Sequence, residues 1–181
     1  AFHGGMDQPL REKALYKFRN GSCPVLVSTD LAARGLDIAD VDHVVHYHLP
    51  VNEEAFTHRN GRTARWQSTG TSFLILHAEE QLPNYVPQDI PSFEVNEGQK
   101  VPKSRWTTLY IGRGKKDKVN KIDIVGFLYK KGGLVRDDVG SVDVMDHHAF
   151  VAVRRAKVKQ LLALVQGEKL KGQKTLIEEA K

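Results

Sequence analysis

The stretch HRNGRTAR, residues 58–65, places three arginines around one glycine with no acidic residue among them. On a helix, the spacing of Arg59, Arg62 and Arg65 puts all three guanidinium groups along one side. Like charges this close repel one another, so this is either a solvated basic face or a site where a ligand supplies the negative charge. A polyphosphate matches the forked arginine head group best. The stretch alone leaves both interpretations open.

The residues around this stretch predict the fold of the first part of the chain. Residues 43–49 and 71–76 are predicted strands, with HRNGRTAR on a helix between them. Residues 25–27, Val-Leu-Val, form an apolar run of the kind buried in a parallel sheet. Further upstream, Asp7 is a suitable helix cap, with Pro9 in the first turn. The apolar face of that helix is predicted to be Leu10, Ala14 and Phe18. This alternation is typical of an α/β fold with a parallel sheet.

A proline-rich stretch separates this part from the rest of the chain. Four of the seven prolines fall between residues 83 and 102, where neither helical nor strand periodicity is present. We expect an extended linker over residues 83–104. The side chains expected to anchor it to a domain surface are Tyr85, Val86 and Phe93.

The remaining residues, 105–181, predict a small α+β domain. Strands are expected over residues 108–112, 141–145, 148–153 and 174–178. One helix is expected after the capping residue Asn120 and another around Val158, Leu161, Leu162 and Val165. The order β-α-β-β-α-β is that of the split βαβ sandwich.

The distribution of charge also divides the chain. Residues 1–100 carry 9 Lys and Arg against 13 Asp and Glu, a net of −4, whereas residues 101–181 carry 18 against 9, a net of +9. A basic second part suggests a polyanionic partner. Cys23 is the only cysteine, which favours a reducing cytoplasm, and no apolar run reaches the length of a membrane span. The abrupt start without methionine suggests a piece of a longer protein.

The stretch STDLAARGLD, residues 28–37, directly follows the apolar run at 25–27. In parallel α/β sheets, ligands bind beyond the carboxyl ends of strands. Thr29 offers a hydroxyl and a backbone N–H to a phosphate oxygen, and Asp37 offers an acceptor to ribose hydroxyls. The alternative is a plain strand-to-helix loop in which Asp30 is a cap.

STDLAARGLD and HRNGRTAR together resemble motifs V and VI of superfamily two helicases, in the form found in DEAD-box RNA helicases. His3-Gly4, Gln8 and Arg11 resemble the HGxxxQxxR stretch that precedes these motifs. The resemblance covers residues 1 to about 76, with Asn60 and Ala64 as departures. It implies a second RecA-like helicase domain, truncated at its start, over residues 1–82.

The resemblance also implies roles for individual residues. Arg62 and Arg65 would act as arginine fingers on the γ-phosphate of ATP, a role worth ~10³–10⁵ in rate in other phosphoryl-transfer enzymes. His58 and Arg59 would couple the two helicase domains, and Asp37 would hold the ATP ribose. The implied RNA contacts in this domain are Gly4, Arg11 and Thr29.

Two motifs that ATP hydrolysis needs are absent from the sequence. It contains no GxxxxGK[ST] loop and no Asp-Glu-Ala-Asp stretch, so no motif in it cradles the β-phosphate or holds Mg²⁺. ATP with Mg²⁺ is the expected cofactor, bound mainly by a missing N-terminal RecA-like domain, which is an expected partner. The chain alone should not turn over ATP.

The second domain is expected to resemble an RNA-recognition motif with a reduced set of aromatic residues. Tyr110 in LYIGRG and Phe150 in DHHAFVAV keep aromatic positions on the predicted sheet, so base stacking there should be limited. Basic residues crowd one loop instead: Arg113, Lys115, Lys116, Lys118 and Lys121. We expect both groups to contact RNA. The alternative is charge that serves solubility only.

Residues 105–181, including IGRGKKDKVNKIDIVGFL and KLKGQKT, are similar to the C-terminal domain of DbpA-type bacterial DEAD-box helicases. That resemblance implies attachment to a hairpin of large-subunit ribosomal RNA during ribosome assembly. We therefore expect part of a cytoplasmic, ATP-dependent RNA helicase. A non-enzymatic RNA-binding or chaperone protein with a helicase-like scaffold is the alternative, and a DNA translocase is a weaker one.

His43, His46 and His48 alternate on a predicted strand, but no zinc site is expected because no second thiol or carboxylate cluster joins them.

Overall fold

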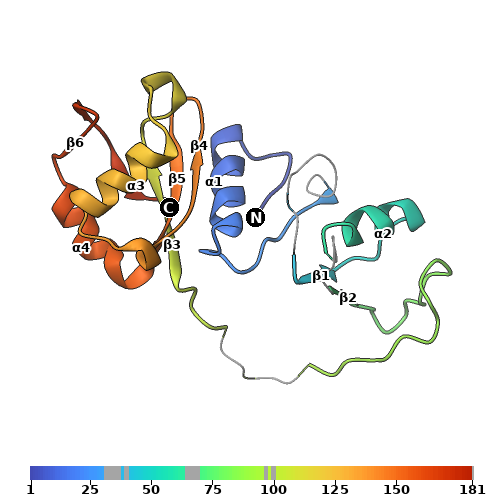
Figure 1. Ribbon diagram of the computed structural model, residues 1–181. Helices are drawn as coiled ribbons and strands as arrows, with labels where there is room; N and C mark the ends of the chain where they lie inside the picture. The colour runs from blue at the N-terminus through green and yellow to red at the C-terminus, as the bar shows by residue number, and fades with distance from the viewer. Residues whose placement is uncertain (31–37, 39–40, 64–69, 96–97, 99–100, 181) are drawn as a thin grey trace. The chain divides into compact units, whose positions relative to one another are not determined.

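The computed structural model describes residues 1–30, 38, 41–63, 70–95, 98 and 101–180 (Figure 1). These residues form two compact units. One consists of Phe2–Gly5 and Val27–Val101, and the other of Ala1–Ala1, Met6–Leu26 and Pro102–Lys181. The units therefore differ from the predicted domains in the helix that follows Asp7, and the predicted boundaries stay a prediction.

The C-terminal part is built on a four-stranded antiparallel sheet. Its strands are β3 (Trp106–Ile111), β4 (Val139–Val144), β5 (Ala149–Arg154) and β8 (Ile177–Glu179). Their order in the sheet is β4-β5-β3-β8, and all neighbouring pairs run antiparallel. With helices α3 (Lys121–Lys130) and α4 (Arg155–Val165), this confirms the predicted β-α-β-β-α-β order.

Helices α3 and α4 cover one face of this sheet (Figure 1). Alternate strand residues such as Leu109 and Val151 are fully buried in the core with Ile124, Leu128 and Leu161 of the helices. The N-terminus of α3 is a capping box, in which Asp123 N–H donates to Asn120 Oδ1 and Asn120 N–H donates to Asp123 Oδ2, both at 2.9 Å. Four short elements were not predicted from sequence. They are strands β6 (Lys169–Leu170) and β7 (Gln173–Lys174), which form a hairpin, and the 3₁₀ turns η2 (Lys115–Asp117) and η3 (Arg136–Asp138).

Helix α1 (Gln8–Arg19) lies on the opposite face of the same sheet (Figure 1). Its cap is Asp7, as predicted, whose carboxylate accepts a hydrogen bond from Leu10 N–H at 3.0 Å. The ring of Tyr16 stacks on Phe150 at 4.9 Å between centroids. Glu12 Oε2 lies 3.5 Å from His148 Nε2. The aromatic face of the sheet is therefore covered by α1.

The other unit contains the predicted pair of parallel strands with a helix between them. Strand β1 (His43–His46) pairs with β2 (Thr71–Leu74) from His43↔Thr71 to His46↔Leu74. Helix α2 (Glu53–Asn60) connects them and is capped by Asn52, which accepts from Ala55 N–H at 2.9 Å. The α/β prediction is confirmed, although both strands are shorter than expected.

The apolar run at residues 25–27 is not a buried strand, which corrects the prediction. Val25 is 63% exposed and Val27 is 69% exposed. Among the described residues, the pairing near it is an isolated bridge between Phe2 and Ser28, with Phe2 N–H donating to Val27 O at 2.8 Å. Burial of a parallel strand requires neighbouring strands and covering helices. The described residues place no such layers around this run.

The three arginines of HRNGRTAR do not share one helix, which corrects a second prediction. Helix α2 ends at Asn60, and Gly61 N–H closes its last turn on Thr57 O at 2.8 Å. Glycine is a poor helix residue, so the helix ends there and Arg62 lies in the turn that follows. Arg65 lies outside the described residues, as does Asp37 of STDLAARGLD.

The first residues of the predicted linker pack against the unit that contains β1 and β2. The hydroxyl of Tyr85 donates to Pro50 O, and its ring lies 5.7 Å from Phe56. Val86 is only 3% exposed, so these two anchors are confirmed. Phe93 contacts the ring of Phe73 edge-on at 5.5 Å but stays 72% exposed. None of the described helices is long and apolar enough to cross a membrane.

Candidate functional site

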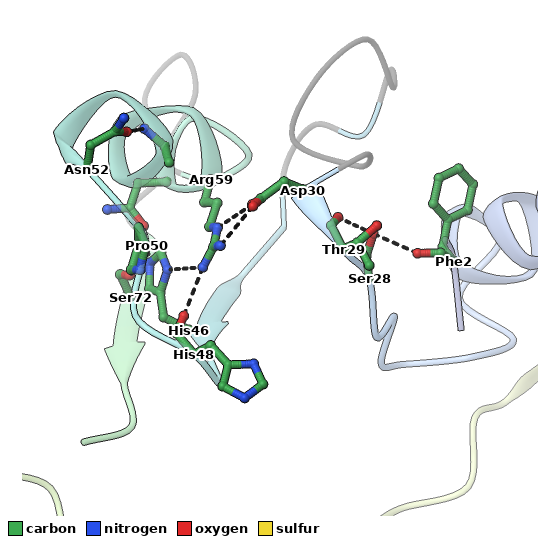
Figure 2. Close-up of polar contacts among 12 residues, drawn as sticks. Phe2, Ser28, Thr29, Asp30, His46, His48, Pro50, Asn52, Arg59 and Ser72 are labelled. Atoms are coloured by element: carbon green, nitrogen blue, oxygen red, sulfur yellow. Dashed lines mark hydrogen bonds and ion pairs between the residues drawn. The ribbon is translucent and has the colours of Figure 1, made fainter. Parts of the chain in front are cut away.

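Arg59 joins the two sequence motifs of the first unit. Its Nε lies 2.5 Å from Asp30 Oδ1 and its Nη2 lies 3.0 Å from Asp30 Oδ2, a two-pronged contact (Figure 2). Its Nη1 donates to the backbone oxygen of His48 at 3.0 Å. One side chain on the last turn of α2 thus connects segment 28–30 to the residues that follow β1.

His46 lies beside this contact and is 1% exposed. Its Nε2 is 3.0 Å from both Asn60 Oδ1 and Ser72 Oγ, and Ser72 Oγ donates to Asn60 Oδ1 at 2.8 Å. Its Nδ1 is 3.5 Å from Arg59 Nη1 (Figure 2). Burial lowers the pKa of His46, and the charge of Arg59 adds to that effect, whereas the hydrogen bond with Asn60 and the charge of Asp30 oppose it.

Two residues of this network had no functional prediction from sequence. In the sequence Asn60 stands out only as a departure from the helicase pattern, whereas in the structure it accepts hydrogen bonds from both His46 and Ser72. His46 was considered only as a metal ligand. Within the part of the chain that the structure describes, no group of three metal-ligating side chains is present. A hydrogen bond between a buried histidine and an asparagine leaves no periodic sequence signal.

The other predicted residues of the first unit lie around this network or apart from it. Thr29 is exposed next to Asp30, and its N–H donates to Phe2 O at 3.3 Å. His58 is exposed, with its Nε2 3.4 Å from Glu54 Oε1. Gly4 has open space around it. Arg11 belongs to α1 in the other unit, where its Nη2 donates to Gln8 Oε1 at 2.8 Å.

The basic loop of the second unit is held in place through its backbone. Lys115 N–H donates to Met145 O at 2.8 Å and Lys116 N–H donates to Asp146 O at 2.9 Å. A Cβ on Gly114 would lie 2.2 Å from Met145 O, so only glycine permits this approach. Because backbone groups make these contacts, the side chains of Lys115 and Lys116 remain exposed.

Asp117 closes the start of this loop. Its Oδ2 accepts from Gly114 N–H at 3.0 Å, and its Oδ1 accepts from Arg113 Nη1 at 2.7 Å. These two hydrogen bonds, with the one from Gly114 the larger cause, lower the pKa of Asp117. Arg113 therefore serves the loop's own structure, in addition to any role with RNA.

The β6–β7 hairpin lies beside the loop and was missed by sequence reasoning. Lys171 Nζ donates to Lys118 O at 2.8 Å and lies 3.2 Å from Asp123 Oδ2. Lys118 itself has a positive φ of 60° and an exposed side chain. Lys116 Nζ lies 3.6 Å from Asp146 Oδ2. The loop lysines thus form an exposed basic surface on a constrained backbone.

The two predicted stacking residues lie on the sheet face under α1. Tyr110 stacks on His148 at 5.5 Å and meets Phe150 edge-on at 5.9 Å. Phe150 is 2% exposed beneath Tyr16. These rings are packed against one another and against α1, so little aromatic surface is available on this face.

Comparison with known proteins finds two domain families. Residues 1–67 match the helicase conserved C-terminal domain family, and residues 108–179 match the DbpA RNA binding domain family. The chain is 36% identical over 180 residues to the ATP-dependent RNA helicase DbpA of Escherichia coli, covering 95% of this chain and 39% of the relative. It is 29% identical over 207 residues to the Bacillus subtilis protein of that name, covering 98% and 43%.

Two further proteins match a smaller share of the chain. The DEAD-box ATP-dependent RNA helicase 9, mitochondrial, of Arabidopsis thaliana is 51% identical over 81 residues, covering 45% of this chain and 13% of the relative. Among solved structures, the C-terminal domain of the DEAD-box protein Dbp5 matches with a TM-score of 0.40 and 33% identity, covering 43% of this chain and 47% of that one. The chain spans about two fifths of the length of the two DbpA relatives.

Proposed function

We propose that this chain, which belongs to the DbpA-type DEAD-box helicases, forms part of an ATP-dependent RNA helicase that remodels structured RNA. The observation that carries the proposal is the contact of Arg59 with Asp30, because it joins the two helicase motifs at one place in the fold. The large-subunit ribosomal RNA is the proposed substrate, ribosome assembly the proposed process, and the cytoplasm the proposed location.

In the proposed mechanism, the chain's own residues bind RNA and complete an ATP site. Arg62 and Arg65 stabilise negative charge on the γ-phosphate, and Asp37 holds the ribose. Because Arg59 is engaged by Asp30 and His48, it keeps the motifs together, and coupling to the neighbouring helicase domain falls mainly to His58. Hydrolysis of bound ATP would supply the free energy for remodelling, and the accompanying Mg²⁺ would be held mainly by the expected N-terminal RecA-like domain.

The first test concerns catalysis. The 181-residue chain should show no ATPase activity, whereas its fusion behind the N-terminal part of the E. coli relative, which this chain does not cover, should show RNA-stimulated hydrolysis. In that fusion, Arg62→Ala should lower kcat by about 10³-fold or more, because the charge on the γ-phosphate loses a stabilising group. Arg136→Ala, an exposed arginine of the other unit, is the control. A fusion that binds RNA without hydrolysing ATP would favour the non-enzymatic alternative.

The second test concerns RNA attachment through the basic loop. Each phosphate neutralised adds roughly 0.9 to the salt slope on duplex-like RNA. Replacing Lys115, Lys116 and Lys118 by alanine should weaken binding of a large-subunit rRNA hairpin and flatten its dependence on salt, measured by titration at several salt concentrations. Tyr110→Ala should cost less, because that ring is packed against His148 and Phe150.

The matched control for the loop variant replaces Lys130, Lys131 and Lys157, which changes the net charge equally but elsewhere on the same unit. An equal loss in both triple variants would indicate general charge attraction. Abolished binding in Tyr110→Ala with normal binding in the loop variant would instead place RNA on the sheet. A hairpin of unrelated sequence bound equally well would argue against the ribosomal assignment.

A further inference from the structure

We propose that His46 is a positioning residue, whose neutral imidazole orients the guanidinium of Arg59 for its contact with Asp30. The helicase motifs in the sequence do not include this histidine, and no group of three metal-ligating side chains is present among the described residues. The inference rests on the proposed function in one respect, which is that segment 28–30 carries contacts to RNA. The orientation of Arg59 itself can be tested without that assumption.

The surroundings of His46 determine which of its ring nitrogens carries the proton. Arg59 has only donors, so the Nδ1 atom facing its Nη1 at 3.5 Å must present a lone pair. On the other side, Asn60 Oδ1 already accepts from Ser72 Oγ and is itself an acceptor toward Nε2 at 3.0 Å. Nε2 must therefore carry the hydrogen. Both sides of the ring require the same neutral tautomer.

All three nitrogens of the Arg59 guanidinium are therefore engaged by hydrogen-bond acceptors. Nε and Nη2 face the carboxylate of Asp30, and Nη1 has one hydrogen for His48 O and one for His46 Nδ1. A second proton on His46 would place an N–H against Nη1 and repel it. The charged groups that face the ring are Arg59 from α2 and Asp30 from the preceding segment. The position of Asp30, and of Thr29 beside it, thus depends on the state of His46.

Packing alone does not explain a histidine at this position. The ring stacks on Phe56 at 5.3 Å between centroids, a contact that phenylalanine would also make. What phenylalanine lacks are the two ring nitrogens and the hydrogen bonds that they form. A variant that keeps the ring stack and removes the nitrogens therefore separates positioning from core packing.

The test measures hydrogen exchange at Arg59 Nε–H by NMR in the 181-residue chain. His46→Phe is combined with Asn60→Leu so that no unpaired amide is left buried. Exchange should become roughly fivefold faster than in the wild-type chain, as expected for loss of a hydrogen bond worth about 1 kcal/mol. His46→Gln, which keeps a donor and an acceptor, should restore much of the protection. Asp30→Ala is the positive control, because it removes the two-pronged contact.

The wild-type chain provides a second measurement that does not depend on any variant folding. The Arg59 Nε–H signal should change with the same pH midpoint as the His46 ring nitrogens. Independent midpoints, or unchanged exchange in the double variant while Asp30→Ala accelerates it, would overturn the proposal. If Arg59 responds as expected but RNA affinity of the chain is unaltered, positioning stands and the RNA role proposed for segment 28–30 fails.

Discussion

Each of the two units is stabilised internally by a different kind of interaction. The sheet of β3, β4, β5 and β8 has a continuous apolar core, in which Leu109, Leu128 and Leu161 are fully buried. The pair β1–β2 instead leaves apolar side chains such as Val45, at 56%, exposed, and its buried centre includes the polar His46. Apolar burial is non-directional and insensitive to pH, whereas a hydrogen-bond network depends on geometry and protonation. The two units should therefore respond to different perturbations.

The largest expected effect is in the apolar core of the second unit. Leu161→Ala removes a fully buried side chain and should lower the free energy of unfolding by about 2–5 kcal/mol. Urea denaturation followed by the amide signals of β3 measures this. Leu164→Ala on the same helix is the control, because Leu164 is 47% exposed and its loss should cost much less. Similar costs for the two leucines would mean that the apolar core does not dominate this unit.

A smaller effect is expected where the basic loop meets the turn between β4 and β5. Gly114→Ala places a Cβ 2.2 Å from Met145 O, a backbone atom that cannot move away easily. The strain should cost about 1–3 kcal/mol and displace the loop lysines, weakening RNA binding. Gly126→Ala, in α3 with open space around it, should instead be neutral or stabilising. Unchanged RNA affinity in Gly114→Ala would show that the loop's backbone position does not matter for binding.

The smallest expected effect is a difference between the two units in how their stability depends on pH. The pKa of His46 is lowered in the folded chain, so the unfolded state binds its proton first as pH falls. Stability from the neutral ring is complete above the unfolded pKa of about 6.5 and is lost as pH falls toward the lower folded value. The protection factors of the β1 and β2 amides, which are corrected for the intrinsic pH dependence of exchange, should fall over that range, whereas those of Leu109 and Val151 should not.

The double variant His46→Phe with Asn60→Leu provides the control for this pH effect. It has no titrating ring at position 46, so the protection factors of its β1 and β2 amides should lose most of their pH dependence in that range. A dependence equal to that of the wild-type chain would assign the effect to other histidines. It would also weaken the contrast between the two units.

Local patterns in the sequence were sufficient for the elements whose residues alternate or carry a cap. Asp7 and Asn120 begin their helices as predicted, and Val158, Leu161 and Val165 form the buried face of α4. The buried strand predicted at residues 25–27 was wrong, because an apolar run is buried only if neighbouring strands cover it. The prediction that Arg62 lies on the helix was also wrong, because α2 ends at Asn60 with Gly61 as its cap.

By itself, the sequence determined the α/β and β-α-β-β-α-β orders, the basic second part and the helicase motifs, because short-range periodicity, caps and charge encode them. The tertiary structure alone decided that Arg59 meets Asp30, 29 residues away in the chain, and that His46 lies between Asn60 and Ser72. It also decided that Tyr16 covers Phe150, 134 positions further along. A polar or aromatic residue gives no sign of its partner in sequence, because the partner is chosen by chain topology and by the requirement that buried donors and acceptors be paired.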